Sequence, residues 1–147
     1  MVLVDTSVWI EIFGRPPRSY GEPGRSPQGE GRKPTGLDPA ALFDLDEVVT
    51  CLPVIQEVLQ GFRDEKPFQI AREAILSFPV VESPMSDGLF LEAVSLYRSA
   101  RRQGLTIRSS VDCLIAACAL RHDLEVLHHD RDYAALSRVS ALRQRRV

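Results

Sequence analysis

The stretch VLVDTSVWI, residues 2–10, decides how the rest of the sequence is interpreted. Its first three residues are aliphatic, which is typical of a short buried strand. From Thr6 onward the apolar side chains recur at helical spacing, and Thr6 or Ser7 is expected to cap that helix. Asp5 lies between the two elements and is the only charged residue of the stretch. An acid at the end of a buried strand needs a reason, because a buried carboxylate without a partner is costly.

Outward from this stretch, short apolar segments alternate with helical patterns. Strands are expected at 2–5, 47–51, 79–83 and 124–129, and helices at 6–13, 38–45, 53–61, 65–78, 86–104, 109–123 and 130–136. Such alternation is typical of a parallel sheet covered on both faces. We therefore predict an α/β fold, a three-layer α/β/α sandwich around a parallel sheet of about four or five strands. The basic tail, residues 142–147, is the candidate for the additional strand.

Length and composition indicate one globular domain over residues 1–147. Hydrophobic residues make up 44% and charged residues 26%, which are ordinary values for a globular protein. The sequence contains no membrane-spanning apolar run and no signal peptide, so we expect a cytoplasmic protein without a membrane partner. Residues 14–36 are rich in Gly, Pro and Arg and predict a flexible insertion.

The cysteines and the net charge exclude several classes of protein. Cys51, Cys113 and Cys118 are odd in number and form no C-x-x-C motif, so we expect buried free thiols rather than disulfides or a zinc site. The net charge of −2 provides no global basic field. Charge alone therefore does not indicate a nucleic-acid partner.

Two acids follow predicted strands. Asp5 ends the first strand and Asp130 follows the strand at 124–129. In open parallel sheets, ligands bind just beyond the carboxyl ends of the strands. Capping of the next helix by Asp130 and Asp132 is the structural alternative. The positions of the two strand-end acids favour a site at this edge of the sheet.

Two further acids stand alone in apolar segments. Asp112 is the only charged residue from 109 through 120, and Glu57 the only one from 48 through 60. Each has a simpler explanation, because Asp112 lies in a first helical turn and Glu57 can pair with an arginine. The case for a shared cation rests on these acids together with Asp5 and Asp130.

Four blocks of the sequence resemble those of a known family. In order and spacing, residues 2–13, 53–61, 108–120 and 126–136 are similar to the four acidic blocks of PIN-domain ribonucleases, and more narrowly of the VapC toxins of bacterial toxin-antitoxin pairs. The long insertion departs from the family pattern. The resemblance implies a metal-dependent endoribonuclease. It implies metal ligation by Asp5, Glu57 and Asp112, with Asp130 as a more variable fourth ligand.

The resemblance also implies supporting residues, cofactors and products. Asp132 is a possible auxiliary acid, and the hydroxyl of Ser7, or of Thr6, corresponds to the one that orients the first aspartate. One or two Mg²⁺ or Mn²⁺ ions suit a site made only of carboxylates, because these ions prefer oxygen ligands. Metal-activated water would cleave RNA to leave 5′-phosphate and 3′-hydroxyl ends.

The expected partners follow from the same resemblance and from the charge of the site. They are an RNA substrate, a second copy of the chain in a homodimer, and an antitoxin whose basic C-terminal tail inserts an arginine among the carboxylates. Arg98, Arg101, Arg102 and Arg108 form a possible rim of RNA phosphate contacts. His128 and His129 are expected at the surface or at a helix cap.

Alternative functions differ in testable features. A PIN nuclease of housekeeping RNA processing or DNA repair, and a non-catalytic PIN-like scaffold that binds a partner, both share the fold. An aspartyl-phosphate phosphatase requires an acid where Ser7 stands. A receiver domain requires a lysine at a late strand end, whereas the only lysines are Lys33 and Lys66.

Overall fold

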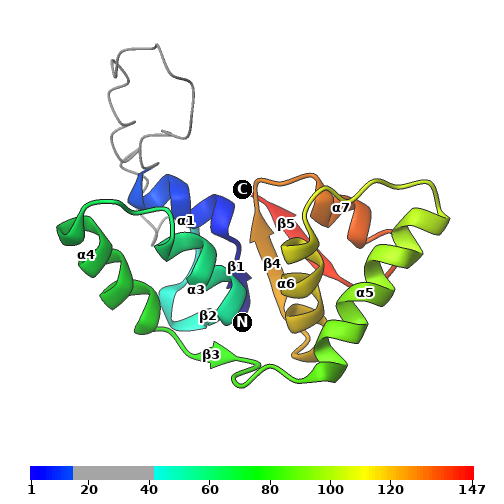
Figure 1. The fold of residues 1–147 in the computed structure, drawn as a ribbon, viewed down its shortest axis with the longest axis horizontal. Coiled ribbons are helices and arrows are strands. Elements are labelled where there is room, and N and C mark those ends of the chain that lie inside the picture. Colours follow the sequence, from blue (N-terminus) through cyan, green and yellow to red (C-terminus); the bar gives the residue numbers. More distant parts are fainter. Residues whose placement is uncertain (15–41) are drawn as a thin grey trace, which may run out of the picture.

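The computed structural model describes residues 1–14 and 42–147 (Figure 1). Nearly all of the predicted insertion, residues 14–36, lies outside the described residues, as does the first half of the helix predicted at 38–45. Where that predicted helix ends, the chain forms a 3₁₀ turn, η1, at Leu45–Glu47.

The described residues form a five-stranded parallel sheet. Its strands are β1 (Val2–Val4), β2 (Val48–Cys51), β3 (Val80–Val81), β4 (Glu125–His128) and β5 (Arg143–Arg146), in the order β3-β2-β1-β4-β5. The predicted parallel sheet is confirmed, and the basic tail supplies its fifth strand. Because β1 is central and pairs with both β2 and β4, the carboxyl ends of β1 and β4 meet at one edge.

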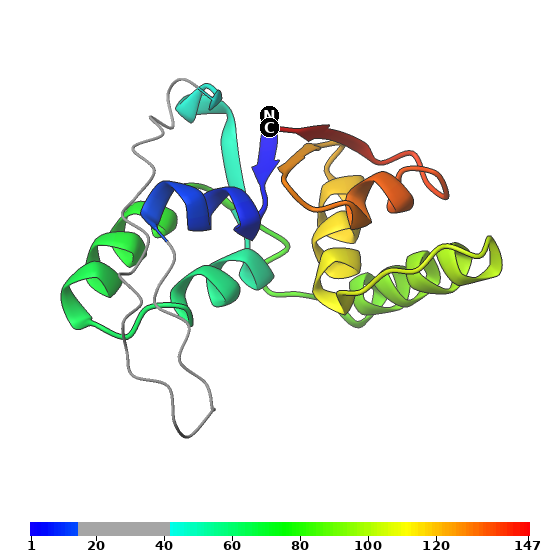
Figure 2. The same cartoon turned by 90° about the horizontal axis from the view of Figure 1, so that it is seen from above.

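Six α-helices are described, and they fall into two groups on either side of the β1–β4 pair (Figures 1 and 2). One group contains α1 (Thr6–Phe13), α3 (Leu52–Leu59) and α4 (Glu65–Leu76). The other contains α5 (Asp87–Arg102), α6 (Ser110–Arg121) and α7 (Asp132–Leu136). The α/β fold predicted from the sequence is therefore confirmed, with helix boundaries close to those expected.

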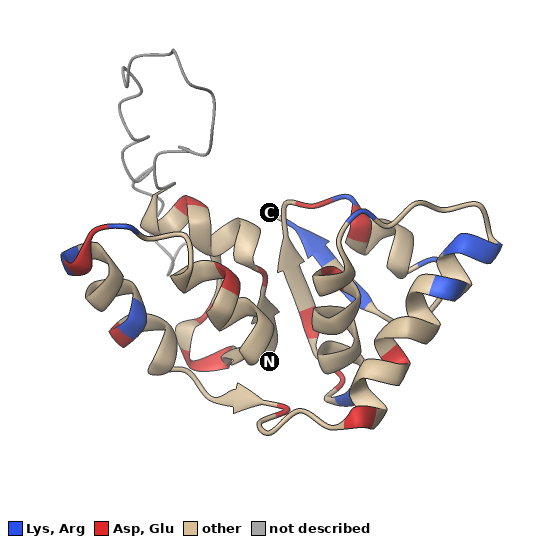
Figure 3. Ribbon diagram, in the orientation of Figure 1, with Lys and Arg blue, Asp and Glu red and all other residues tan. Residues whose placement is uncertain are grey.

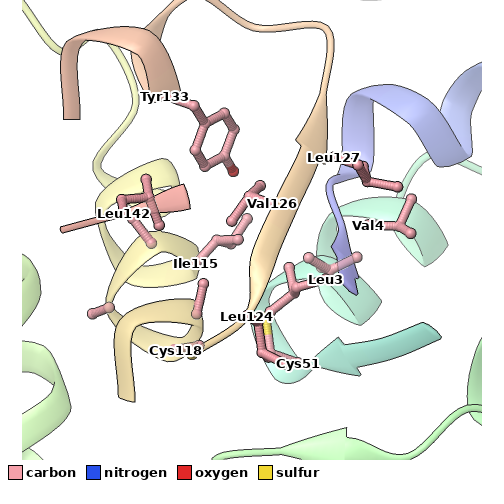
Figure 4. Close-up of a cluster of buried hydrophobic side chains, with 14 of the residues drawn as sticks. Leu3, Val4, Cys51, Ile115, Cys118, Leu124, Val126, Leu127, Tyr133 and Leu142 are labelled. Carbon is pink, nitrogen blue, oxygen red and sulfur yellow. The ribbon is translucent and has the colours of Figure 1, made fainter. Parts of the chain in front are cut away.

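The core packs against both faces of the central strands, and Figure 4 shows the part of it around these strands and α6. Leu3, Val4, Val126 and Leu127 are fully buried, as is Ile115 of α6. Burial of both faces explains why β1 and the middle of β4, Val126 and Leu127, are aliphatic without alternation. Most residues of α6 are buried, which makes its single acid, Asp112, unusual.

The cysteines are buried free thiols, as predicted. The expectation for His128 is wrong. Its side chain is buried, its Nε2 lies 2.6 Å from Gln144 Oε1, and its ring packs against Tyr133. Because β4 is an interior strand, side chains on both of its faces are covered. His129 is partly exposed and pairs with Glu11. Within the described ranges, no helix is long and apolar enough to cross a membrane.

Candidate active site

Asp5 is held rigidly at the end of β1. Its backbone N–H donates to the Leu127 carbonyl at 2.9 Å, which ties it to β4. Its Oδ2 accepts from the backbone N–H of Ser7 at 2.9 Å and from the Ser7 hydroxyl, so Asp5 itself is the N-cap of α1. The sequence-based assignment of that cap to Thr6 or Ser7 is therefore wrong. Its other oxygen, Oδ1, accepts from the buried Tyr133 hydroxyl at 2.6 Å.

Glu57 comes to the site from α3. The Thr6 hydroxyl donates to Glu57 Oε2 at 2.8 Å, so the two neighbouring hydroxyls of α1 orient different acids. Burial raises the pKa of the Glu57 carboxyl, the Thr6 hydrogen bond opposes this, and the nearby charge of Asp5 raises the pKa further. The influence of Asp5 shows that the two carboxylates share one electrostatic environment.

Asp112 presents a buried carboxylate oxygen that lacks a partner. The side chain is 7% exposed, and within the described part of the chain its Oδ2 has no hydrogen-bond partner. Burial first, and then the charges of Asp5 and Asp130, raise the pKa of the Asp112 carboxyl to about 8. The Ser109 hydroxyl caps α6 by accepting a hydrogen bond from the backbone N–H of Asp112, so the carboxylate of Asp112 is not required as the cap. A buried acid with an orphaned oxygen fits a cation-binding site, because a cation would compensate its charge.

Asp130 and Asp132 lie beside Asp112. Asp132 is buried, and its Oδ2 accepts the backbone N–H groups of Arg108 at 2.7 Å and Ser109 at 3.2 Å. Asp130 is more exposed, and its Oδ1 accepts the backbone N–H of Asp132 at 2.9 Å. The guanidinium of Arg108 reaches both carboxylates. The N-cap of α7 is Arg131 without a side-chain cap bond, so the structural alternative fails for Asp132, whose carboxylate bonds residues before α6. Only Asp130 bonds an N–H at the start of α7.

Among the described residues, the acids that come within ligand distance of one another lie on the α6 and α7 side, and this set does not include Asp5 or Glu57. One carboxylate oxygen from each of Asp112, Asp130 and Asp132 lies within 4.8 Å of the others. Asp5 is close enough to raise the pKa values of both Glu57 and Asp112. An all-carboxylate donor set with one unpartnered buried oxygen fits a hard divalent cation that prefers oxygen ligands.

Sequence reasoning missed Tyr133 and the ion pairs of Arg108. Tyr133 is fully buried and donates to Asp5 across 128 positions of sequence. Its only signal was a hydroxyl-bearing aromatic shortly after Asp130 and Asp132, which equally indicates core packing. Burial and the nearby charge of Asp5 raise the pKa of the Tyr133 phenol, so it remains a proton donor to Asp5.

The four arginines of the predicted rim separate into two sets. Arg98, Arg101 and Arg102 lie exposed or partly exposed on α5, and Arg98 and Arg102 line a shallow hollow on that helix. Figure 3 shows basic residues near the end of α5 and along β5. Arg108 differs, because its guanidinium binds the acids of the site.

Comparisons with known proteins agree with this architecture. The family model for the PIN domain matches residues 33–139, so the chain belongs to the PIN-domain family. The chain is also 32% identical, over 97% of its length and 96% of theirs, to VapC ribonuclease Mb1587 of Mycobacterium bovis and Ribonuclease VapC11 of Mycobacterium tuberculosis. Within the PIN family it therefore belongs with the VapC ribonucleases.

Solved structures share the fold at lower identity. VapBC-5 from Mycobacterium tuberculosis matches with a TM-score of 0.66 and 20% identity, over 99% of this chain and 98% of that one. VapBC2 from Rickettsia felis, bound to a DNA fragment from its promoter, matches with a TM-score of 0.69 and 13% identity, over 100% and 99%. At these identities the likeness concerns the fold.

Proposed function

We propose that this protein is a metal-dependent endoribonuclease that acts in the cytoplasm as the toxin of a toxin-antitoxin pair. The observation that carries the proposal is the buried, unpartnered carboxylate oxygen of Asp112 beside two further acids. Membership of the VapC ribonucleases supports RNA as the substrate.

Asp5, Glu57, Asp112 and Asp130 would hold Mg²⁺ or Mn²⁺. When bound, the cation neutralises charge on the scissile phosphate and activates water for its hydrolysis. Ser7 and Tyr133 fix the orientation of Asp5, and Thr6 fixes Glu57. Asp132 supports the loop that carries Asp130. Such anchoring reduces the reorganisation required when substrate binds.

RNA would approach along the exposed basic surface. Arg98, Arg101 and Arg102 on α5 suit contacts with phosphates, which position a strand without reading its sequence. Hydrolysis by water would leave 5′-phosphate and 3′-hydroxyl ends.

Incubation of the purified protein with RNA tests the proposed activity. We expect cleavage with Mg²⁺ or Mn²⁺, none with EDTA, and recovery when the metal is restored. Ligation of an adaptor that requires a 5′-phosphate identifies the product ends. Cleavage that persists in EDTA and in Asp112→Asn would exclude this site as its source.

The acidic site also suggests the mode of inhibition. We propose that the antitoxin inserts an arginine from its basic C-terminal tail among the carboxylates, where a charge-assisted pair substitutes for the cation. The neighbouring gene, if it encodes a short DNA-binding protein, is the one to co-express. Removal of the tail arginines should restore toxicity, and inhibition that survives their removal would rule this mechanism out.

We further propose a homodimer, as expected from the family resemblance. Sedimentation velocity of the purified chain should give twice the monomer mass of 16.4 kDa. A species of monomer mass at micromolar concentration would contradict this.

A further inference from the structure

Arg108 bridges two acids of the proposed metal site. Its Nη2 donates to Asp130 Oδ1 at 2.6 Å, and its Nε donates to Asp132 Oδ1 at 3.3 Å. Asp112 lies close to both acids. Carboxylates this close repel one another, so one positive charge among them stabilises the metal-free arrangement.

The two acids depend on the guanidinium to different degrees. Asp132 is 2% exposed and keeps its two bonds from the backbone N–H groups of Arg108 and Ser109 wherever the Arg108 side chain lies. Asp130 is 36% exposed and sits at the solvent edge of the cluster. Departure of the guanidinium would therefore leave Asp132 in place and open Asp130 to another cation.

The Arg108 side chain can leave at low cost. It is 49% exposed, and its ion pair with Asp130, which is 36% exposed, is of the exposed kind that contributes little to stability. A divalent cation carries twice its charge and takes oxygen ligands. Because the guanidinium already occupies Oδ1 of Asp130, a cation that binds this atom competes directly with Arg108.

We propose that Arg108 is a positioning residue that couples metal binding to RNA binding. The inference rests on the proposed function, because it takes these acids to be metal ligands. In the metal-free protein, Arg108 supplies positive charge to the cluster. When a divalent cation enters, the guanidinium leaves Asp130 and becomes available to an RNA phosphate, which its planar fork fits.

Metal titration without RNA gives the first test. Isothermal titration with Mn²⁺ should show about fivefold tighter binding to Arg108→Gln than to wild type, because the competing cation is gone. Arg72→Gln is the matched control, since Arg72 is exposed on α4 and bonds Gln69 of its own helix. It should bind Mn²⁺ as wild type does. Arg108→Lys keeps the charge without the fork and should give an intermediate affinity, which provides a second comparison if Arg108→Gln folds poorly.

The position of the guanidinium gives the second test. In ¹⁵N spectra, the Nε–H signal of Arg108, assigned by its loss in Arg108→Lys, should exchange slowly with water in the metal-free protein. Mg²⁺ should move this signal and speed its exchange. A signal unchanged at saturating Mg²⁺ would overturn the displacement.

RNA binding gives the third test. Stopped-flow fluorescence anisotropy, read before cleavage, should show that Mn²⁺ strengthens RNA binding more in wild type than in Arg108→Gln. Equal Mn²⁺ affinity in wild type, Arg108→Gln and Arg72→Gln would overturn the role of Arg108 and leave the proposed nuclease intact. Failure of all of them to bind Mn²⁺ would overturn the metal site and this inference with it.

Discussion

The two sides of the acidic site hold their carboxylates in different ways. Beside α1 and α3, Asp5 and Glu57 accept hydrogen bonds from neutral hydroxyl and amide groups. Beside α6 and α7, Asp130 and Asp132 share a guanidinium, and one oxygen of Asp112 has no partner among the described residues. Neutral donors orient a carboxylate and leave its charge in place, whereas a guanidinium cancels the charge. The first side is therefore already arranged for a cation, and the second must rearrange to accept one.

If both sides hold metal, loss of an acid on either side removes activity. Asp5→Asn, Glu57→Gln and Asp112→Asn should each lower Mg²⁺-dependent RNA cleavage by at least about a hundredfold and abolish toxicity in cells. Asp130→Asn should be milder, because Asp130 is the more exposed acid. Glu73→Gln, at an exposed position of α4, is the control. Full activity in any of the first three would remove that residue from the site.

Removal of the hydrogen bond from Tyr133 tests whether neutral donors arrange the Asp5 side of the site for metal binding. Tyr133→Phe should weaken Mn²⁺ binding by about tenfold and lower kcat with little change in KM, because Asp5 loses the donor to its Oδ1. The melting temperature of the metal-free protein should change little, since the ring remains. Tyr97→Phe, on the exposed face of α5, should match wild type in both measurements. Equal Mn²⁺ affinity in both variants would reduce Tyr133 to a packing residue.

The orphaned oxygen of Asp112 makes the second side sensitive to pH. The folded-state pKa of about 8 lies above the ordinary value, so the folded protein binds the proton more tightly than the unfolded chain. Stability should therefore fall as pH rises from about 4 to about 8. Asp112→Asn should flatten this dependence and raise the metal-free melting temperature at pH 8 by a few degrees.

Added Mg²⁺ should stabilise wild type and affect Asp112→Asn far less, because the cation binds the folded state. The position of Asp112 in the first turn of α6 opposes the expected rise in the melting temperature of Asp112→Asn, since the helix dipole favours an acid there. Thermal scans from pH 5 to pH 8, with and without Mg²⁺, measure both effects. If Asp112→Asn is destabilised and responds to Mg²⁺ as wild type does, then Asp112 stabilises the start of α6 and does not bind metal.

The smallest effect is expected from Thr6. Its hydrogen bond lowers the pKa of Glu57 against the effect of burial, so Thr6→Val should raise that pKa. The acidic limb of the rate profile should move to higher pH, with little change in rate well above it. Ser7→Ala is the informative comparison, because Ser7 bonds Asp5 and not Glu57. A shift of the same size in both variants would remove the distinction between the two hydroxyls.

Local sequence determined most of the fold. Aliphatic runs such as 2–4 and the helical spacing that follows specify a strand and a helix whatever surrounds them, because the periodicity of apolar side chains reflects backbone geometry. The same kind of local pattern identified Asp5, Glu57 and Asp112, because each is the only charged residue in an apolar segment. An acid in such a segment indicates a site before any contact is known, since its burial requires compensation.

Contacts between distant segments were decided only by the tertiary structure. Tyr133 donates to Asp5, and Arg108 binds Asp130 and Asp132, across separations that no local pattern encodes. His128 is buried because β5, formed by the basic tail, covers β4 and turns it into an interior strand. The sequence by itself thus determined which acids are candidates for a metal site. The packing of the two helix groups decided which donors hold them and left one oxygen of Asp112 without a partner, because hydrogen-bond partners depend on proximity in space and not along the chain.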